Sequence, residues 1–278
     1  MSSEPLTLIV GGLGKTGRRV ALRLTALGAR WRAASRSSEL PFDWEREETW
    51  PSVLRGVTAI YLTYYPDLAL PGASERIRRL CALAVENAVE QIVLLSGRGE
   101  HQVWPSERAV RESGAAFTIL RCAWFCQNFD EGHLLDPILD GELALPAGSV
   151  SEPFIDADDI ADVAVAALDR SQRARHAGQI YDLTGPRLLG FGEAVHEIAR
   201  VTRRRIRYSP ISDTAYAEAL KLHLPAPQVA FFSELFGMLL DGHNSLLADG
   251  VQRALGRAPR DFSEYVQRAF ESGAWGGA

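Results

Sequence analysis

The sequence predicts an α/β protein with a doubly wound parallel sheet and a small, mostly helical C-terminal cap. From Leu6 to about Gly185, short apolar runs rich in β-branched residues alternate with amphipathic helical stretches, which is the pattern of a parallel sheet covered by helices. A glycine-rich turn directly follows the first of these apolar runs. Past Gly185 the alternation gives way to a mostly helical pattern broken by proline and glycine.

Six strands are expected in the alternating region. They are Leu6 to Val10, Ala29 to Ala34, Ala59 to Thr63, Ile92 to Ser96, Phe117 to Leu120 and Ile180 to Leu183. The clearest helix lies between the third and fourth strands, where apolar residues recur at helical spacing from Ile77 to Ala88. A second helix is expected from Pro105 to Gly114, because proline suits a first turn and glycine a helix end.

A third helix is expected to begin near Asp156. Asp156, Asp158 and Asp159 stand at its start, where the helix dipole favours negative charge. We interpret them as helix-start residues rather than as a metal cluster.

The same patterns suggest a division of the chain. Residues 1–153 are expected to form a dinucleotide-binding core, with a cap insertion from about residue 122. Residues 154–185 return to the core, and residues 186–278 form a substrate-binding cap laid over the C-terminal edge of the sheet.

Composition narrows the class of protein. The 278 residues are 46% apolar and carry a net charge of −5, which argues against a general affinity for nucleic acid or anionic membrane. No apolar run approaches the roughly 20 residues that span a bilayer, and the first residues do not resemble a secretion signal. We therefore expect a cytoplasmic protein, a monomer or homodimer, with a small-molecule substrate.

Cysteine usage indicates neither disulfides nor a metal site. The three cysteines, Cys81, Cys122 and Cys126, are an odd number in apolar surroundings, which suits reduced thiols. No paired histidines or further cysteines complete a tetrahedral set. No metal is expected.

The segment "LIVGGLGKTGRRV" predicts a phosphate-binding turn. Gly11, Gly14 and Gly17 come between a strand and a helix, the context in which glycines allow a tight turn and close approach of backbone N–H groups to a pyrophosphate. Alone, the spacing would fit a simple turn equally well. The residues expected to bind the dinucleotide are Gly11, Gly12, Leu13, Gly14, Lys15, Thr16, Gly17, Arg36, Ser37, Thr63, Ser96 and Gly97.

The end of the second strand indicates NADP(H). Sites for NAD usually place a carboxylate there to bind the ribose hydroxyl, whereas this chain has Ser35, Arg36, Ser37 and Ser38. A guanidinium and hydroxyls favour a 2′-phosphate. The alternative for Arg36 is an ordinary surface arginine.

The usual short-chain dehydrogenase pair, a tyrosine with a lysine four residues on, is missing. None of the seven tyrosines has such a lysine. Ser96 can occupy the usual serine position, but only Glu107 and Arg108 stand where a helix-borne acid and base would follow.

Several segments together resemble the NmrA-like branch of atypical short-chain dehydrogenases. They are "GGLGKTG", "ASRSS", "VTAIYLTYYPD", "VEQIVLLSGRG", "SERAVRESGAAFTILRCAWFCQNF" and "PFIDADDIADVAVAAL", in order from about residue 6 to 170, with a similar C-terminal ending. Cys122 departs from the proline that commonly follows the arginine in relatives, which puts the shape of the nicotinamide pocket in doubt.

The resemblance implies a Rossmann-like core, a small cap and NADP(H). Its members include quinone, triphenylmethane-dye and ergot-alkaloid-type iminium reductases, and regulators that bind dinucleotides without turnover. An electrophilic acceptor needs little acid catalysis, because positioning and exclusion of water supply much of the acceleration.

Residues after the strand ends are the candidates for the substrate site, because open α/β sheets bind ligands there. We expect Tyr65 to orient or protonate the substrate, with structural packing as an equal alternative. Tyr64, Trp124, Phe125, Gln127, Asn128 and Phe154 are expected to contact a flat substrate; core packing explains each aromatic residue at least as well.

Three functions follow from the sequence. The first is an NADPH-dependent reductase that transfers hydride to a quinone, imine, iminium or enone. The second is a non-catalytic regulatory protein that senses NADP(H). The third is an isomerase or hydratase that retains the cofactor.

Overall fold

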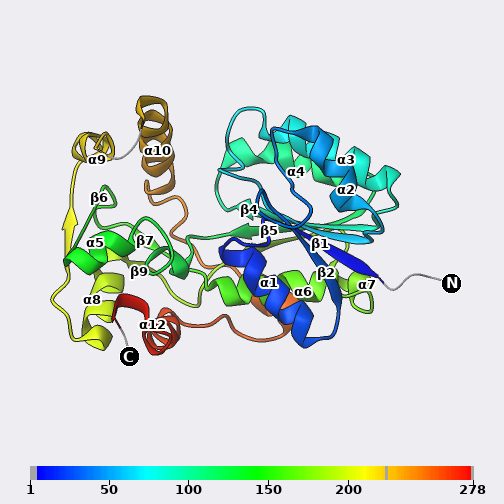
Figure 1. The fold of residues 1–278 in the computed structure, drawn as a ribbon. Helices are drawn as coiled ribbons and strands as arrows, with labels where there is room; N and C mark the ends of the chain where they lie inside the picture. Colours follow the sequence, from blue (N-terminus) through cyan, green and yellow to red (C-terminus); the bar gives the residue numbers. More distant parts are fainter. Residues whose placement is uncertain (1–4, 223–224, 277–278) are drawn as a thin grey trace. The chain divides into compact units, whose positions relative to one another are not determined.

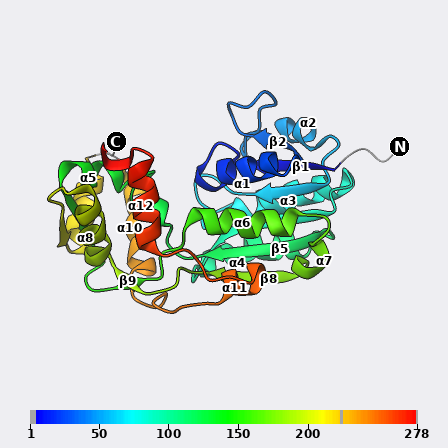
Figure 2. The ribbon, with the colours of Figure 1, turned by 90° about the horizontal axis from the view of Figure 1, so that it is seen from below.

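The computed structural model describes residues 5–222 and 225–276, and the chain divides into two compact units. The first unit comprises Met1–Cys122, Ala157–Leu183 and Asp249–Ala258. The second comprises Ala123–Asp156, Thr184–Ala248 and Pro259–Ala278. Figures 1 and 2 show the ribbon in two views.

The first unit contains a six-stranded parallel sheet in the order β2-β1-β3-β4-β5-β8. Its strands are β1 (Leu6–Val10), β2 (Arg30–Ala34), β3 (Ala59–Leu62), β4 (Gln91–Gly97), β5 (Ala116–Cys122) and β8 (Gln179–Leu183). All six predicted strands are confirmed: β1 has the predicted ends, and the ends of the others differ by at most two residues. The order reverses beside β1, and ligands of open α/β sheets bind at such a reversal.

Helices cover both faces of this sheet (Figure 1). Helix α1 (Lys15–Ala26) packs against α6 (Ala157–Leu168) on one face, and α3 (Ala73–Glu86) against α4 (Trp104–Arg111) on the other. The shorter helices are α2 (Trp50–Leu54), α7 (Arg173–His176) and α11 (Gly250–Leu255), with the 3₁₀ turns η1 (Glu47–Thr49) and η2 (His101–Val103). The predicted helices at α3, α4 and α6 are confirmed.

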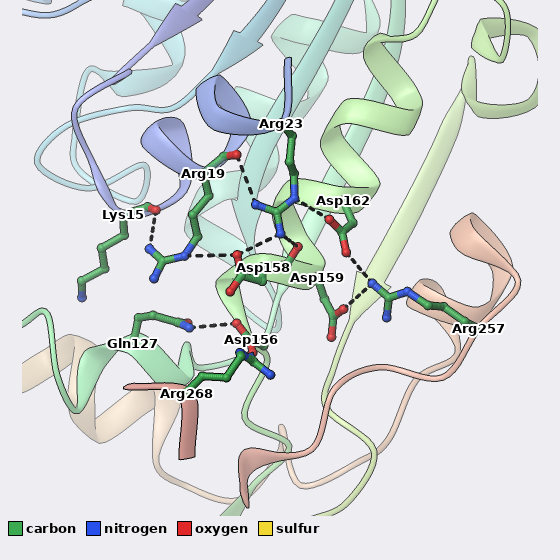
Figure 3. A network of polar contacts seen from close by, with 10 residues as sticks. All are labelled: Lys15, Arg19, Arg23, Gln127, Asp156, Asp158, Asp159, Asp162, Arg257 and Arg268. Atoms are coloured by element: carbon green, nitrogen blue, oxygen red, sulfur yellow. Dashed lines mark hydrogen bonds and ion pairs between the residues drawn. The ribbon is translucent and has the colours of Figure 1, made fainter. Parts of the chain in front are cut away.

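Arginines join α1 and α11 to the acidic start of α6 (Figure 3). Arg23 forms ion pairs with Asp158, at 2.8 Å, and with Asp162. Arg257, just after α11, pairs with the fully buried Asp159 at 2.7 Å. The acidic residues therefore serve helix packing, and among the described residues no group of His, Cys, Asp and Glu side chains is arranged to hold a metal.

The second unit combines two small sheets with helices. Strands β6 (Glu142–Leu145) and β10 (Arg207–Pro210) pair in parallel, while β7 (Ser151–Glu152) and β9 (Leu189–Gly190) pair antiparallel. Its helices are α5 (Leu135–Asp140), α8 (Phe191–Thr202), α9 (Asp213–Leu220), α10 (Ala226–Leu239) and α12 (Phe262–Glu271), with the turns η3 (Cys126–Asn128) and η4 (Ala274–Gly276). Buried phenylalanines, among them Phe129, Phe191 and Phe262, form its core.

The predicted division of the chain needs one correction. Residues 249–258 were expected in the cap, but they belong to the first unit. Gly250 allows this, because a Cβ there would overlap the carbonyl oxygen of Asp182 in β8. Val251 and Ala254 are buried as α11 packs against β8 and α6.

In the part of the chain that the structure describes, none of the helices is both long and apolar enough to cross a bilayer.

The close contact of α11 with β8 predicts the effect of two glycine substitutions. Gly250→Ala should lower the free energy of unfolding by about 1–3 kcal/mol, because the added methyl group forces α11 away from the strand. Gly237→Ala is the matched control: Gly237 lies in α10 with open space around its Cα, so this change should be neutral or stabilising by up to about 1 kcal/mol. Thermal unfolding measures both effects. Equal effects of the two substitutions would contradict the close packing of α11 against β8.

Candidate active site

The turn after β1 holds its shape through Gly11. Gly11 has a φ of +76°, which favours glycine, and its N–H donates to the Ala34 carbonyl oxygen at 2.9 Å. A Cβ at Gly11 would collide with the hydroxyl of Thr63, which itself donates to the Val10 carbonyl oxygen at 2.9 Å. The turn is thus fixed between the ends of β2 and β3.

Gly17 brings the start of α1 against this turn. A Cβ at Gly17 would overlap the carbonyl oxygen of Gly11, so no larger residue allows the helix to approach so closely. Gly14 is the N-cap and has no side chain to form a cap hydrogen bond, and the first turn of α1 carries no acidic residue. Such an end presents backbone N–H groups and the positive end of the helix dipole to an anion.

A cleft of about 480 Å³ opens beside the turn, a volume within the range of small-molecule sites. It is lined by residues that follow β1, β2 and β3. They are Val10, Gly11, Leu13, Gly14, Ala34, Ser35, Arg36, Ser37, Phe42, Asp43, Trp44, Glu45, Thr63, Tyr64, Tyr65 and Pro66.

Arg36 presents a positive charge in this cleft. Its side chain is exposed, and its guanidinium carbon lies 5.2 Å from the centre of the Tyr65 ring. Among the described residues the guanidinium forms neither a hydrogen bond nor an ion pair. Its charge is therefore available to an anionic ligand.

Aromatic residues form one wall of the cleft. The Trp44 ring packs against Tyr64 with centroids 4.6 Å apart and against Phe42 at 5.0 Å. The Tyr64 hydroxyl accepts a hydrogen bond from Arg76 at 3.1 Å. Tyr64 is therefore held in place by its ring and its hydroxyl; its predicted contact with substrate stays a prediction.

The cleft has the groups that a phosphorylated dinucleotide needs. The start of α1, whose N-cap is a glycine, suits the pyrophosphate. Arg36 and Ser37 after β2 suit a 2′-phosphate. The buried hydroxyl of Ser35 has no hydrogen-bond partner among the described residues. It can therefore form a hydrogen bond with a ligand bound beside the end of β2. NADP(H) therefore fits the residues present.

The structure brings together half of the predicted dinucleotide-binding residues in the cleft. These are Gly11, Leu13, Gly14, Arg36, Ser37 and Thr63. Gly12, Lys15, Thr16 and Gly17 lie in the turn and the first turn of α1 without lining the cleft. Ser96 and Gly97 end β4 and do not line it either.

Ser96 is engaged in a buried network. Its hydroxyl donates to Glu107 Oε1 at 2.7 Å. Arg121 of β5 donates to both carboxylate oxygens of Glu107, at 2.9 and 2.6 Å. The sequence pointed to Glu107 with Arg108, but Arg108 is exposed. Glu107 is thus committed to holding the ends of β4 and β5 together.

Glu100, after β4, lies outside the cleft lining, and it has a shifted pKa that the sequence does not indicate. Burial and the nearby charge of Asp67 raise the pKa of the Glu100 carboxyl from an ordinary 4.5 to about 7. Burial also raises the pKa of Asp67, which follows β3. Because β3 and β4 are neighbours, the two carboxyls meet at the C-terminal edge of the sheet.

The predicted substrate contacts of the second unit have different environments. Trp124 packs its ring edge-on against Phe191 and Phe236, and its indole N–H is buried without a partner among the described residues. Phe125 is half-buried and pairs its backbone with Ile155.

The remaining three of these predicted contacts are less available to a ligand. Gln127 is buried and donates its side-chain N–H to Asp156 at 2.8 Å (Figure 3). Asn128 is half-buried and forms contacts of its own. Phe154, only 2% exposed, belongs to the phenylalanine core, so packing accounts for it without a ligand.

Asp43 and Trp44, in the segment "PFDWERE", are readable from the sequence as residues that face the adenine, with a solvated loop as the alternative, and both line the cleft. Phe42 of the same segment also lines the cleft and was missed. Nothing local in the sequence marks Glu100, because its environment depends on Asp67, which lies 33 positions earlier in the chain.

The chain is similar in sequence to known proteins. An uncharacterised oxidoreductase of Bacillus subtilis, YesF, is 31% identical over 283 residues, covering 96% of this chain and 95% of the relative. Festuclavine dehydrogenase of Aspergillus fumigatus is 27% identical over 295 residues, covering 96% and 98%. No family profile matches the chain.

Solved structures share the fold. Triphenylmethane reductase of Citrobacter sp., complexed with NADP(H), has a TM-score of 0.76 at 17% identity, covering 94% of this chain and 98% of that one. An NADPH-dependent quinone oxidoreductase of Escherichia coli, complexed with NADPH, gives 0.77 at 18%, covering 95% and 99%. The negative transcriptional regulator NmrA gives 0.71 at 14%, covering 97% of each chain.

The raised pKa of Glu100 predicts a pH-dependent stability. The carboxyl is protonated more readily in the folded than in the unfolded chain, so the stability is full below pH 4.5 and is lost progressively between pH 4.5 and about 7. Above pH 7 the loss is about 3 kcal/mol. Glu100→Gln should therefore melt at a higher temperature than the wild type at pH 8 and at the same temperature at pH 4. The exposed Glu112→Gln is the control, and a pH-independent difference for Glu100→Gln would refute the prediction.

Proposed function

The chain belongs to the NmrA-like family of atypical short-chain dehydrogenases/reductases, and from this premise we propose that it is an NADPH-dependent reductase. Its acceptor in this proposal is a small electrophile, such as a quinone, an enone, an imine or an iminium compound. The observation that carries the proposal is the cleft in the first unit, with the glycine-capped start of α1 on one side and an exposed arginine on another.

The dinucleotide would be held by separate parts of this cleft. The backbone of the turn from Gly11 to Gly14 and the start of α1 would bind the pyrophosphate. Arg36 and Ser37 would bind the 2′-phosphate, and Thr63, which lines the cleft after β3, would lie beside the ribose. The aromatic wall around Trp44 and Tyr64 offers a flat apolar surface for the adenine.

When bound, NADPH supplies a hydride, and reduction of the acceptor also consumes one proton. The hydroxyl of Ser96 is committed to Glu107, and that of Tyr64 accepts from Arg76. An acceptor that is already electrophilic lowers the need for a strong acid. The role of Tyr65 as proton donor stays a prediction from the sequence.

The names of the similar proteins support the range of acceptors. A quinone oxidoreductase and a triphenylmethane reductase share the fold, and a festuclavine dehydrogenase is a relative in sequence. Trp124 and Phe125, both half-buried aromatic residues of the second unit, are the proposed contacts for a flat acceptor.

Turnover tests the proposal directly. Purified protein should oxidise NADPH steadily when a quinone, an enone or a cyclic iminium compound is added, and the reaction is followed by loss of absorbance at the nicotinamide band. Tight NADPH binding without turnover on any of them would instead support the regulatory alternative. Absence of NADPH binding would remove both.

Arg36→Asp tests the cofactor assignment. The change removes the cation and adds a carboxylate suited to the ribose hydroxyls, so the affinity for NADPH should fall by about 10- to 100-fold and that for NADH should rise. The control is Arg55→Asp, which makes the same charge change at an exposed position outside the cleft. Calorimetry measures the dissociation constants of both variants for NADPH and NADH. If Arg36→Asp leaves the ratio of these two constants unchanged, the role of Arg36 is refuted.

A further inference from the structure

We propose that Tyr65 is a specificity-determining residue whose ring holds the Arg36 guanidinium in position for the 2′-phosphate of NADP(H). This inference rests on the proposed function and deepens it. It assigns the selection of the phosphorylated dinucleotide to a pair of residues from two different loops. Tyr65 acts in this account through Arg36, and it is a positioning residue.

The pair is formed at the ends of strands that are not neighbours in the sheet. Arg36 follows β2 and Tyr65 follows β3, while β1 lies between these strands. The guanidinium carbon stands 5.2 Å from the ring centroid, inside the roughly 6 Å range of cation–π attraction. Both side chains line the same cleft.

The Tyr65 side chain is exposed to solvent, as expected of a residue at a ligand-binding site. Its side chain is 65% exposed, so the hydrophobic core gains little from it. Tyr64, the preceding residue, is different: it packs against Trp44 and binds Arg76. Tyr65 instead contacts a residue that the cleft presents to solvent.

An aromatic ring positions an arginine without neutralising it. A carboxylate partner would hold Arg36 equally well but would cancel its charge and use its hydrogen-bond donors. The face of a ring attracts the cation through its quadrupole and leaves the N–H groups at the guanidinium edge for a phosphate. A free arginine would lose rotamer entropy on binding the phosphate, whereas a stacked one has already lost part of it.

Two carboxylates in the cleft make such positioning necessary. Asp43 and Glu45 also line it, and each would compete for a mobile guanidinium. Asp43 instead accepts a hydrogen bond from the Glu45 backbone N–H at 3.0 Å. With Arg36 over Tyr65, its charge remains directed to the end of β2, where the ribose of a bound dinucleotide is expected.

The test compares two probes that differ only in the 2′-phosphate. Binding of adenosine 2′,5′-bisphosphate and of adenosine 5′-monophosphate is measured by calorimetry for the wild type, Tyr65→Leu, Tyr65→Phe, Arg36→Met and the double variant Tyr65→Leu/Arg36→Met. The wild type should prefer the bisphosphate. Tyr65→Leu should reduce this preference by about two- to fivefold, while Tyr65→Phe, which keeps the ring, should retain it.

The double variant shows whether Tyr65 acts through Arg36. In the Arg36→Met background, Tyr65→Leu should change the preference no further, because the two effects are coupled. Trp104→Leu is the control for losing an exposed ring, since Trp104 is 50% exposed and lies outside the cleft.

The possible failures point to different conclusions. If Tyr65→Leu keeps the full preference while Arg36→Met loses it, or if it weakens both probes equally, the positioning role is overturned and the proposed NADP(H) site stands. If the wild type shows no preference and Arg36→Met changes nothing, both are overturned. The 2′-phosphate is on the adenosine half of the dinucleotide, so this role is an alternative to the proton-donor role expected for Tyr65 from the sequence. Unchanged turnover of Tyr65→Phe supports the positioning role, and a large loss of turnover supports the proton donor.

Discussion

The contact of Gly17 with the carbonyl oxygen of Gly11 is the constraint on which the site depends. It brings the first turn of α1 directly onto the turn after β1, so the N-terminus of the helix lies beside the strand ends. The same turn is fixed by the Thr63 hydroxyl on one side and by the Ala34 carbonyl on the other. Three strands thereby determine where an anion can be bound, and the side chains that follow them become the lining of one cleft.

Arginine has several distinct roles in this protein. Arg23 and Arg257 join helices through carboxylates at the start of α6. Arg121 holds the buried Glu107 by two hydrogen bonds, an arrangement that a lysine cannot make because it lacks the planar fork. Arg36 differs from all of these, since its contact is an aromatic ring and its charge stays uncompensated. Arg23, Arg121 and Arg257 are thus paired with carboxylates, whereas the charge of Arg36 is left for a ligand.

In place of a tyrosine–lysine pair, the structure has a hydrogen-bonded network at the end of β4. At the end of β4, the hydroxyl of Ser96 is tied to Glu107, and Arg121 of β5 completes the network. Such a closed group stabilises neighbouring strand ends, and the hydroxyl of Ser96 is already engaged as a hydrogen-bond donor to Glu107. This agrees with chemistry in which the reactivity of the acceptor replaces acid catalysis, and it separates the buried Glu107 from Glu100, whose pKa lies near neutrality.

The sequence by itself determined the elements and the type of cofactor. Strands, the amphipathic helices and the glycine turn depend on neighbours within a few positions, so their patterns can be read along the chain; Arg36 at the end of β2 is such a local feature. Only the tertiary structure decided which distant residues meet. The pairing of Arg36 with Tyr65, of Glu107 with Arg121 and of Glu100 with Asp67 depends on the strand order, and the return of residues 249–258 to the first unit depends on the space that Gly250 leaves beside β8. The physical reason is that strand order and close approach are set by packing across the whole sheet, and no local run of residues records them.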